Sequence, residues 1–262
     1  MMKRLGRKVV ALLIVGVVAC QMIGCGSSAS TSSKNDNIVS VAATPVPHAD
    51  ILNQIIDDMK EKGYDLTIQE YTDYIIPNLA VEQGEVMANF FQHTPYLDEF
   101  NTERGTHIVS IGKVHYEPFG IYAGTKDEFT VSNGDKIAVP NDVTNEARSL
   151  NLLEKAGVIK LKEGAGLTAT KIDIIDNPHN IEIVELESAM IPRTLSSVAF
   201  ACMNGNYAME AGFKVSDALY IEDQSSLAAK TYANVICVKE GNEDKPWAKA
   251  LVECLKSQKI KD

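Results

Sequence analysis

Short apolar runs alternate with helical segments along this chain, and the alternation starts twice. The first series places strands at 38–43, 66–71 and 86–91, with helical patterns between them. The second series begins with a strand at 136–139, followed by a helix over 146–156. Strand–helix–strand repeats fold into mostly parallel sheets with right-handed crossovers. The sequence therefore predicts an α/β protein built from two such units.

The two units follow one another without a Pro- or Ser-rich linker. Strand patterns at 218–221 and 233–238 and a terminal helix from Pro246 come after the second unit, and the last strand and helix complete the first one. This order predicts two lobes joined by crossing strands, with a ligand cleft between them that closes by a hinge motion. The predicted boundaries are 38–126 together with 217–262 for the first lobe, and 127–216 for the second.

The first 24 residues have the pattern of a signal peptide. A basic start is followed by an almost wholly apolar run at 9–19 and then by small residues. The apolar run is shorter than the roughly 20 residues that a transmembrane helix needs. We therefore expect the segment 1–24 to be removed and the folded part to lie outside the cytoplasmic membrane.

Two cysteines near the end of this segment are candidates for lipidation. The residues 22–25 resemble the lipobox of bacterial lipoproteins, in which the cysteine is acylated and becomes the new N-terminus. The residues 17–20 fit the same loose pattern, so Cys20 is an alternative to Cys25. We prefer Cys25 because the polar, Ser-rich stretch after it suits a flexible tether, which we place at 25–37.

The net charge excludes one class of partner. The chain has 25 basic and 35 acidic residues, and removal of the signal peptide leaves 21 basic ones, a net charge of −14. Nucleic-acid binding requires clustered Lys and Arg, so no nucleic acid is expected as a partner. Three cysteines remain beyond the tether, and an odd number in apolar surroundings predicts buried free thiols; they are Cys202, Cys237 and Cys254.

The stretch 89–97 is the first candidate for a binding site. A strand that ends in Phe90 and Phe91 is followed at once by Gln, His93, Thr and Tyr96. Ligands of open α/β sheets bind at the carboxyl ends of strands. Because side chains alternate along a strand, only one phenylalanine can face a cleft, and we choose Phe91. A core strand followed by a polar turn is the alternative reading.

Seven longer motifs carry a resemblance to a known family. They are ATPVPH (43–48), YTDYIIPN (71–78), ANFFQHTPYL (88–97), VHYEPFGIY (114–122), IAVPNDVTNEAR (137–148), GLTAT (166–170) and NGNYA (204–208). With these motifs the chain resembles the NlpA/MetQ-type lipoproteins, the methionine-binding substrate-binding proteins of ABC importers, from about Ile38 to the C-terminus.

The resemblance implies a type II periplasmic-binding fold and methionine as the ligand. It also implies delivery of the ligand to the permease and ATPase of an ABC importer, by a monomer that is lipid-anchored on the extracytoplasmic face of the cell membrane. No cofactor and no enzymatic activity are expected. Another small apolar amino acid and a methionine-containing dipeptide are alternative ligands, because all of them offer similar charged ends.

Each chemical group of methionine has candidate partners under this reading. Arg148, expected in the first turn of its helix, would hold the carboxylate bidentately. Tyr74, Phe91 and Tyr96 would line an apolar slot for the thioether, since sulfur–aromatic contacts are favourable. His93 would either hydrogen-bond the ligand or close the pocket by packing.

Asn204 and Asn206 complete the predicted site. They follow the last strand of the second unit, so they are expected at its carboxyl end, facing the cleft. Their amide groups offer an acceptor for the ligand ammonium and a donor for its carboxylate. The alternative is that Asn-Gly-Asn only forms a turn.

A zinc site and an enzyme are the alternative functions. His48, His93, His115 and Glu117 form a conceivable zinc set, and zinc-binding importer components share the two-lobe design. Only two of the four are close in sequence, whereas zinc ligands are commonly clustered, so no metal site is predicted. Hydrolase and phosphate-loop motifs are absent from the sequence, and Cys202 lies in an apolar run that favours an inert thiol.

Overall fold

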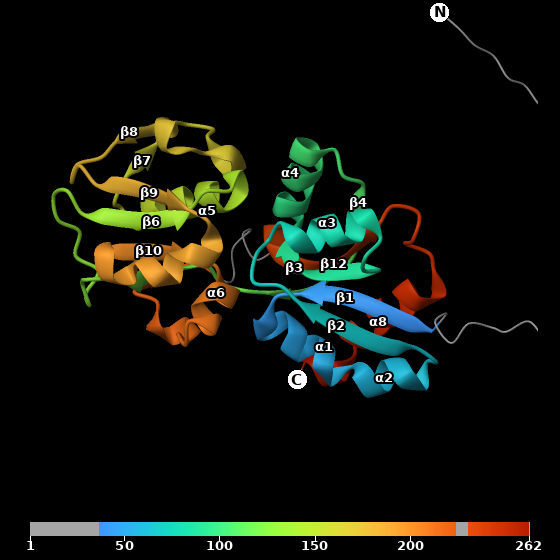
Figure 1. The fold of residues 1–262 in the computed structure, drawn as a ribbon. Coiled ribbons are helices and arrows are strands. Elements are labelled where there is room, and N and C mark those ends of the chain that lie inside the picture. Colours follow the sequence, from blue (N-terminus) through green and yellow to red (C-terminus); the bar gives the residue numbers. More distant parts are fainter. Residues whose placement is uncertain (1–36, 224–229, 262) are drawn as a thin grey trace, which may run out of the picture. The chain divides into compact units, whose positions relative to one another are not determined.

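The computed structural model describes residues 37–223 and 230–261. The predicted signal peptide, Cys20, Cys25 and almost all of the predicted tether lie outside these residues. Within the described part, no helix combines the length and the apolar character needed to cross a membrane. The described residues form two five-stranded sheets, each with helices packed on both faces, and a small two-stranded sheet (Figure 1).

The first sheet is mostly parallel, as predicted. Its strands in spatial order are β2 (Asp65–Glu70), β1 (Ile38–Ala43), β3 (Ala88–His93), β12 (Ala233–Lys239) and β4 (Ile108–Tyr116). The strand from the end of the chain, β12, lies antiparallel between β3 and β4. The last strand therefore completes the first sheet, which confirms that prediction.

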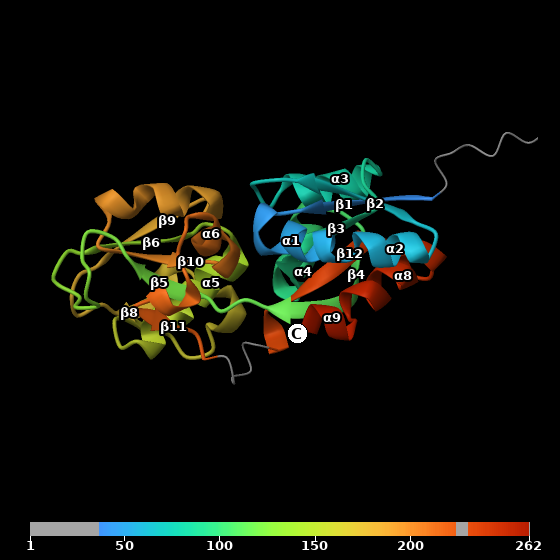
Figure 2. The same ribbon diagram turned by 90° about the horizontal axis from the view of Figure 1, so that it is seen from below.

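Helices pack against both faces of the first sheet through side chains that alternate along its strands. Val41, Phe90 and Ile236 pack on one face, whereas Ala42 and Val235 pack on the other. This alternation is the two-residue period of a pleated strand. The first face is covered by α1 (Asp50–Gln54), α2 (Ile56–Glu61) and α8 (Pro246–Leu255), and the second by α3 (Ile76–Gln83) and α4 (Thr94–Arg104) (Figures 1 and 2). The segment η1 (Pro45–Ala49) joins β1 to α1, and α9 (Gln258–Lys261) follows α8.

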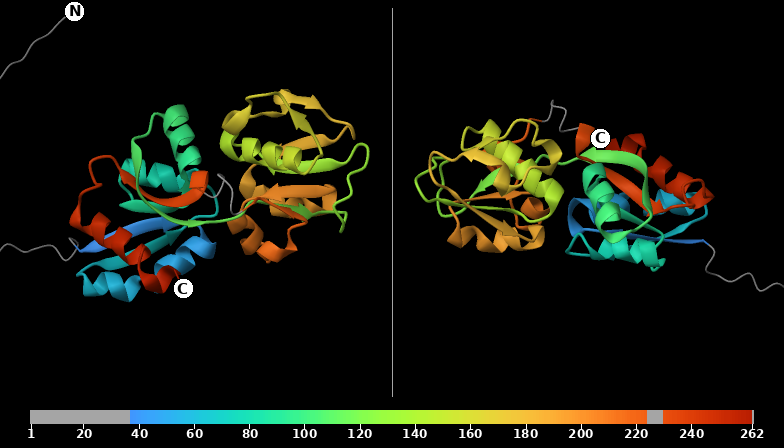
Figure 3. Two further views of the ribbon diagram at one scale, coloured as in Figure 1. Left: turned by 180° about the vertical axis from the view of Figure 1, so that it is seen from behind. Right: turned by 90° about the horizontal axis from the view of Figure 1, so that it is seen from above.

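The second sheet follows the same plan. Its spatial order is β11 (Tyr220–Ile221), β5 (Gly120–Ala123), β10 (Phe200–Met203), β6 (Lys136–Pro140) and β9 (Glu182–Leu186). One face packs against α5 (Val143–Lys155), and the other against η4 (Ser188–Ser197) and α6 (Gly205–Glu210) (Figure 3). Short elements complete this part: β7 (Lys160–Leu161), η2 (Gly166–Thr168), η3 (Lys171–Asp173), β8 (Ile174–Asp176) and η5 (Val215–Asp217).

We call each sheet with its helices a lobe, and the crossings between the lobes differ from the predicted boundaries. The strands β5 and β11 fall within the ranges assigned to the first lobe, yet both pair in the second sheet. The side chains of Ile121 and Tyr122 on β5 are fully buried in the two cores of the second lobe. The chain therefore crosses between the lobes just after Tyr116 and again after Ile221.

The helix α5 begins three residues earlier than predicted. The Asp142 carboxylate accepts a hydrogen bond from the backbone N–H of Asn145 at 2.9 Å, which makes Asp142 the N-cap. Arg148 is consequently in the second turn of α5, not in the first.

Candidate functional site

A cavity lined by both lobes contains all seven residues predicted to bind ligand. About 330 Å³ within its lining is not filled by protein atoms, and this volume includes open solvent. Tyr74, Phe91, His93 and Tyr96 come from the first lobe, and Arg148, Asn204 and Asn206 from the second. The further lining residues are Gln92, Glu117, Asn145, Gly205 and Asn234.

Three aromatic rings form one wall of the cavity. The ring of Tyr74 has its centroid 5.5 Å from that of Phe91 and 5.7 Å from that of Tyr96. The Tyr96 hydroxyl donates to the backbone carbonyl of Tyr74 at 3.1 Å, which fixes the Tyr96 ring. Phe90, the neighbour of Phe91, packs into the sheet core on the opposite face. The strand alternation thus gives Phe91 to the cavity and Phe90 to the core.

His93 joins the aromatic wall to the second lobe. Its Nδ1 accepts a hydrogen bond from the backbone N–H of Tyr96 at 3.1 Å and so caps α4. Its Nε2 lies 3.1 Å from Oδ1 of Asn145, so the ring donates from Nε2. Burial, followed by the nearby Arg148 charge, lowers the pKa of His93 to about 3. The ring is neutral at pH 7, and protein groups engage both of its nitrogens.

Arg148 is held by a carboxylate of the protein. Its Nε donates to both oxygens of Glu222, at 3.2 and 3.1 Å, and its Nη2 donates to Oε2 of Glu222 at 2.5 Å. The same Nη2 reaches the backbone carbonyl of Glu117 at 3.1 Å. The ring of Tyr232 stacks against the guanidinium, with its centroid 4.2 Å away. Within the described residues, only Nη1 is left without a protein acceptor.

The two asparagines lie where β10 ends and α6 begins, as the sequence suggested. Asn204 donates from Nδ2 to Oδ1 of Asn145 at 2.9 Å, and Asn206 accepts a hydrogen bond from the Tyr74 hydroxyl. Among the described residues, the Oδ1 atom of Asn204 and the Nδ2 atom of Asn206 are buried without a hydrogen-bond partner. Buried polar atoms usually have partners. The cavity therefore presents one unpaired acceptor and one unpaired donor.

Asn145 is the most connected of the lining residues that the sequence analysis did not select. Besides accepting from His93 and Asn204, it donates from Nδ2 to both oxygens of Asp142, each at 3.0 Å. It lies inside the quoted motif 137–148, which was the only available signal. Gln92 is held in a buried amide network with Asn78 and Asn89, and this network fixes the end of β3.

The four residues considered as a zinc set divide into two places. His93 bonds Asn145, whereas ligand atoms of His48, His115 and Glu117 lie within 4.8 Å of one another. The three described cysteines are buried free thiols, as predicted. Burial raises the pKa of the Cys202 thiol to about 12, so this thiol is not a nucleophile at neutral pH.

Comparison with known proteins identifies the family. The sequence model of the NlpA lipoprotein family matches residues 39–262. The chain belongs to this family. The D-methionine-binding lipoprotein MetQ of Salmonella typhimurium is 36% identical over 252 residues, which cover 94% of this chain and 89% of that protein.

Two solved structures of such proteins show the same fold. A lipoprotein from Ruminococcus gnavus matches with a TM-score of 0.85 and 55% identity, covering 86% of this chain and 93% of that one. A nutrient-binding protein of Burkholderia cenocepacia, solved with methionine bound, matches with a TM-score of 0.80 and 39% identity, covering 85% and 93%. The predicted two-lobe binding-protein fold is confirmed.

Proposed function

We propose that this NlpA-family chain is the substrate-binding protein of an ABC importer and that it captures methionine. The observation that carries the proposal is the composition of the cavity. One wall has the three aromatic rings of Tyr74, Phe91 and Tyr96, and the other presents Arg148 and the unpaired amide atoms of the two asparagines. The family relation supports the same ligand, since MetQ is a D-methionine-binding lipoprotein and the Burkholderia protein was solved with methionine bound.

The proposed roles follow the chemistry of the amino acid. The rings accept the thioether, with sulfur–aromatic contacts each worth about 0.3–1.5 kcal/mol. The unpaired Nδ2 of Asn206 and the remaining Nη1 of Arg148 donate to the ligand carboxylate. The unpaired Oδ1 of Asn204 accepts from its ammonium group. His93 closes the cavity by packing, because both of its nitrogens are already engaged.

Ligand binding is expected to raise the melting temperature of the full-length protein without added metal. A site occupied at 100 times its Kd gains roughly 2.7 kcal/mol, which corresponds to about 5–10 °C for a protein of this size. Thermal melts with L-methionine, D-methionine, glycyl-methionine and leucine, each with and without a chelator, measure this shift and rank the alternative ligands.

Glutamate serves as the control ligand, because its charged side chain does not suit an aromatic wall. A shift produced by zinc but by none of the amino acids would replace the proposal with the zinc-binding alternative.

We also propose that the chain acts as a lipid-anchored monomer on the extracytoplasmic face, passes its ligand to a permease and ATPase, and catalyses no reaction. Cys25 is the proposed anchor. Metabolic labelling with a palmitate analogue is expected to mark the wild type and the Cys20→Ala variant but not Cys25→Ala, because acylation needs the thiol. Labelling of Cys25→Ala with loss from Cys20→Ala would place the anchor at Cys20.

A further inference from the structure

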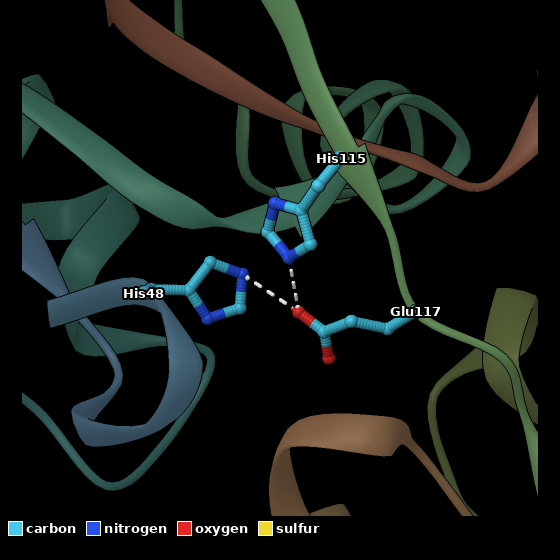
Figure 4. Close-up of side chains that lie close together, drawn as sticks. All are labelled: His48, His115 and Glu117. Carbon is cyan, nitrogen blue, oxygen red and sulfur yellow. Dashed lines mark hydrogen bonds and ion pairs between the residues drawn. The ribbon is translucent and has the colours of Figure 1, made fainter. Parts of the chain in front are cut away.

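A buried carboxylate next to the cavity has no role in the functions described so far. Glu117 follows β4, and its oxygen Oε1 lies 2.6 Å from Nε2 of His115. The Nε2 atom of His48 approaches the same oxygen to 3.2 Å, in poor hydrogen-bonding geometry (Figure 4). His48 is fully buried, and a hydrogen bond of 2.7 Å between its Nδ1 and the hydroxyl of Thr44 fixes its ring.

The second oxygen of this carboxylate lies next to Gly205, which lines the cavity. Figure 4 shows both imidazole rings on the Oε1 side, with the other oxygen pointing away from them. Oε2 of Glu117 accepts no hydrogen bond from any described residue. It lies beside Gly205, where an added Cβ would come within 3.2 Å of it. Glu117 and Gly205 both line the cavity, so Oε2 is available to a ligand there.

The carboxylate of Glu117 is charged and buried. Burial alone would raise the pKa of Glu117, but His48, His115 and Arg148 together bring it below its usual value. Burial lowers the pKa of His48 to about 4, so this ring is neutral at pH 7. The Arg148 side chain is engaged by Glu222. No described Lys or Arg side chain lies within ion-pair distance of Glu117, and a buried charge is costly unless it is paired.

We infer that Oε2 of Glu117 is the counter-ion for the ligand's ammonium group, with His48 and His115 holding the carboxylate from behind. The unpaired Oδ1 of Asn204 lines the same cavity and supplies a second acceptor. The site then selects ligands with a free, positively charged amino group. This inference rests on the proposed function, because it assigns one end of the proposed ligand.

A divalent metal held by the same three residues is the competing occupant. Metal–ligand bonds of about 2.0–2.2 Å in tetrahedral geometry keep ligand atoms roughly 3.3 Å apart. The separation of 2.6 Å between His115 and Glu117 is shorter and requires a shared proton. A hydrogen bond between His115 and Glu117 holds the carboxylate in place, so that its other oxygen can pair with a cation in the cavity.

The test compares methionine with 4-(methylsulfanyl)butanoate, which is methionine without its amino group. Titration calorimetry of the full-length wild type is expected to show at least about 100-fold tighter binding of methionine, because the analogue leaves a buried charge unpaired. In Glu117→Gln this preference should fall below about fivefold. The fall should come from weaker binding of methionine, with the affinity for the analogue retained.

Glu146→Gln is the matched control. Glu146 is also a buried glutamate, but it accepts a hydrogen bond from the backbone of Lys171 and does not line the cavity. It should keep the wild-type preference. If Glu117→Gln still prefers methionine to the analogue 100-fold, the inference is wrong. It is also wrong if zinc stabilises the wild type but does not stabilise Glu117→Gln.

The proposed function and the inference can fail separately. If the wild type binds neither methionine nor its analogue, methionine is the wrong ligand, and leucine with 4-methylpentanoate forms the second pair. A preference for leucine that Glu117→Gln removes supports the inference on its own. If the wild type binds leucine and 4-methylpentanoate equally, or binds neither of them, both the inference about Glu117 and the proposed ligand class are wrong.

Discussion

Arg148→Ala is expected to lower the free energy of unfolding by about 3–5 kcal/mol, because it leaves the Glu222 carboxylate buried without its cation. Both side chains are almost fully buried, with 4% and 6% of their surfaces exposed. The Tyr116 hydroxyl still donates to Glu222 at 2.6 Å, which keeps the loss within this range. Urea denaturation followed by circular dichroism measures the change.

The same substitution is expected to weaken methionine binding at least tenfold, since it removes the proposed Nη1 donor to the ligand carboxylate. The double variant Arg148→Ala with Glu222→Gln separates the two effects. It removes the stranded charge, so it should regain most of the stability but none of the affinity.

Arg193→Ala is the control, because Arg193 is exposed and does not line the cavity; its effect should stay within about 0.5 kcal/mol. Recovery of affinity in the double variant would show that Arg148 only balances Glu222 and does not touch the ligand.

The pairing of Arg148 with Glu222 illustrates what the sequence could not supply. The two residues are 74 positions apart, and neither composition nor spacing says which buried carboxylate meets a given guanidinium. The sequence therefore predicts a ligand carboxylate at a guanidinium that the structure pairs with the carboxylate of Glu222. The start of α5 differs from the prediction for a local reason: the sequence pattern predicts a loop at Asp142, whereas this residue caps the helix.

Periodic features were predictable from the sequence. The strand alternation placed Phe91 at the cavity and the order of elements placed Asn204 and Asn206 at the end of β10, because both follow from regular backbone geometry. The points at which the chain crosses between the lobes were not predictable, since an extended segment such as β5 can pair in either sheet. Two of the partners of Asn145 are 52 and 59 residues away, so its central position arises only in the folded chain.

Asn145→Ala is expected to lower the free energy of unfolding by about 2–4 kcal/mol and to weaken methionine binding at least tenfold. The side chain accepts from His93 of the first lobe and Asn204 of the second, and it donates to Asp142. Its loss leaves two buried donors, on His93 and Asn204, without a partner, at about 1–3 kcal/mol each before water enters. The freed amide of Asn204 would no longer hold its Oδ1 in position.

Asn151→Ala on the same helix is the matched control for binding. Asn151 donates to the carbonyls of Ala147 and Gly166 and does not line the cavity, so its removal should cost stability but leave the affinity within twofold of the wild type. An Asn145→Ala variant with wild-type affinity would show that the asparagine joins the lobes without orienting the site.

Asn145→Asp adds a test with a defined pH dependence. It keeps an acceptor for His93 and Asn204 but places a second carboxylate against Asp142, whose pKa burial already raises. Two adjacent carboxylates raise the pKa of one of them further, and a shared proton then replaces the lost amide N–H. Because this folded-state pKa lies above the unfolded value of about 3.9, the proton stabilises the fold at low pH, and that stabilisation is lost as the pH rises through the folded pKa.

Relative to the wild type, the variant should therefore gain unfolding free energy as the pH falls from 8 to 5. A difference that stays constant over this range would show that Asp142 and residue 145 do not interact in the folded protein.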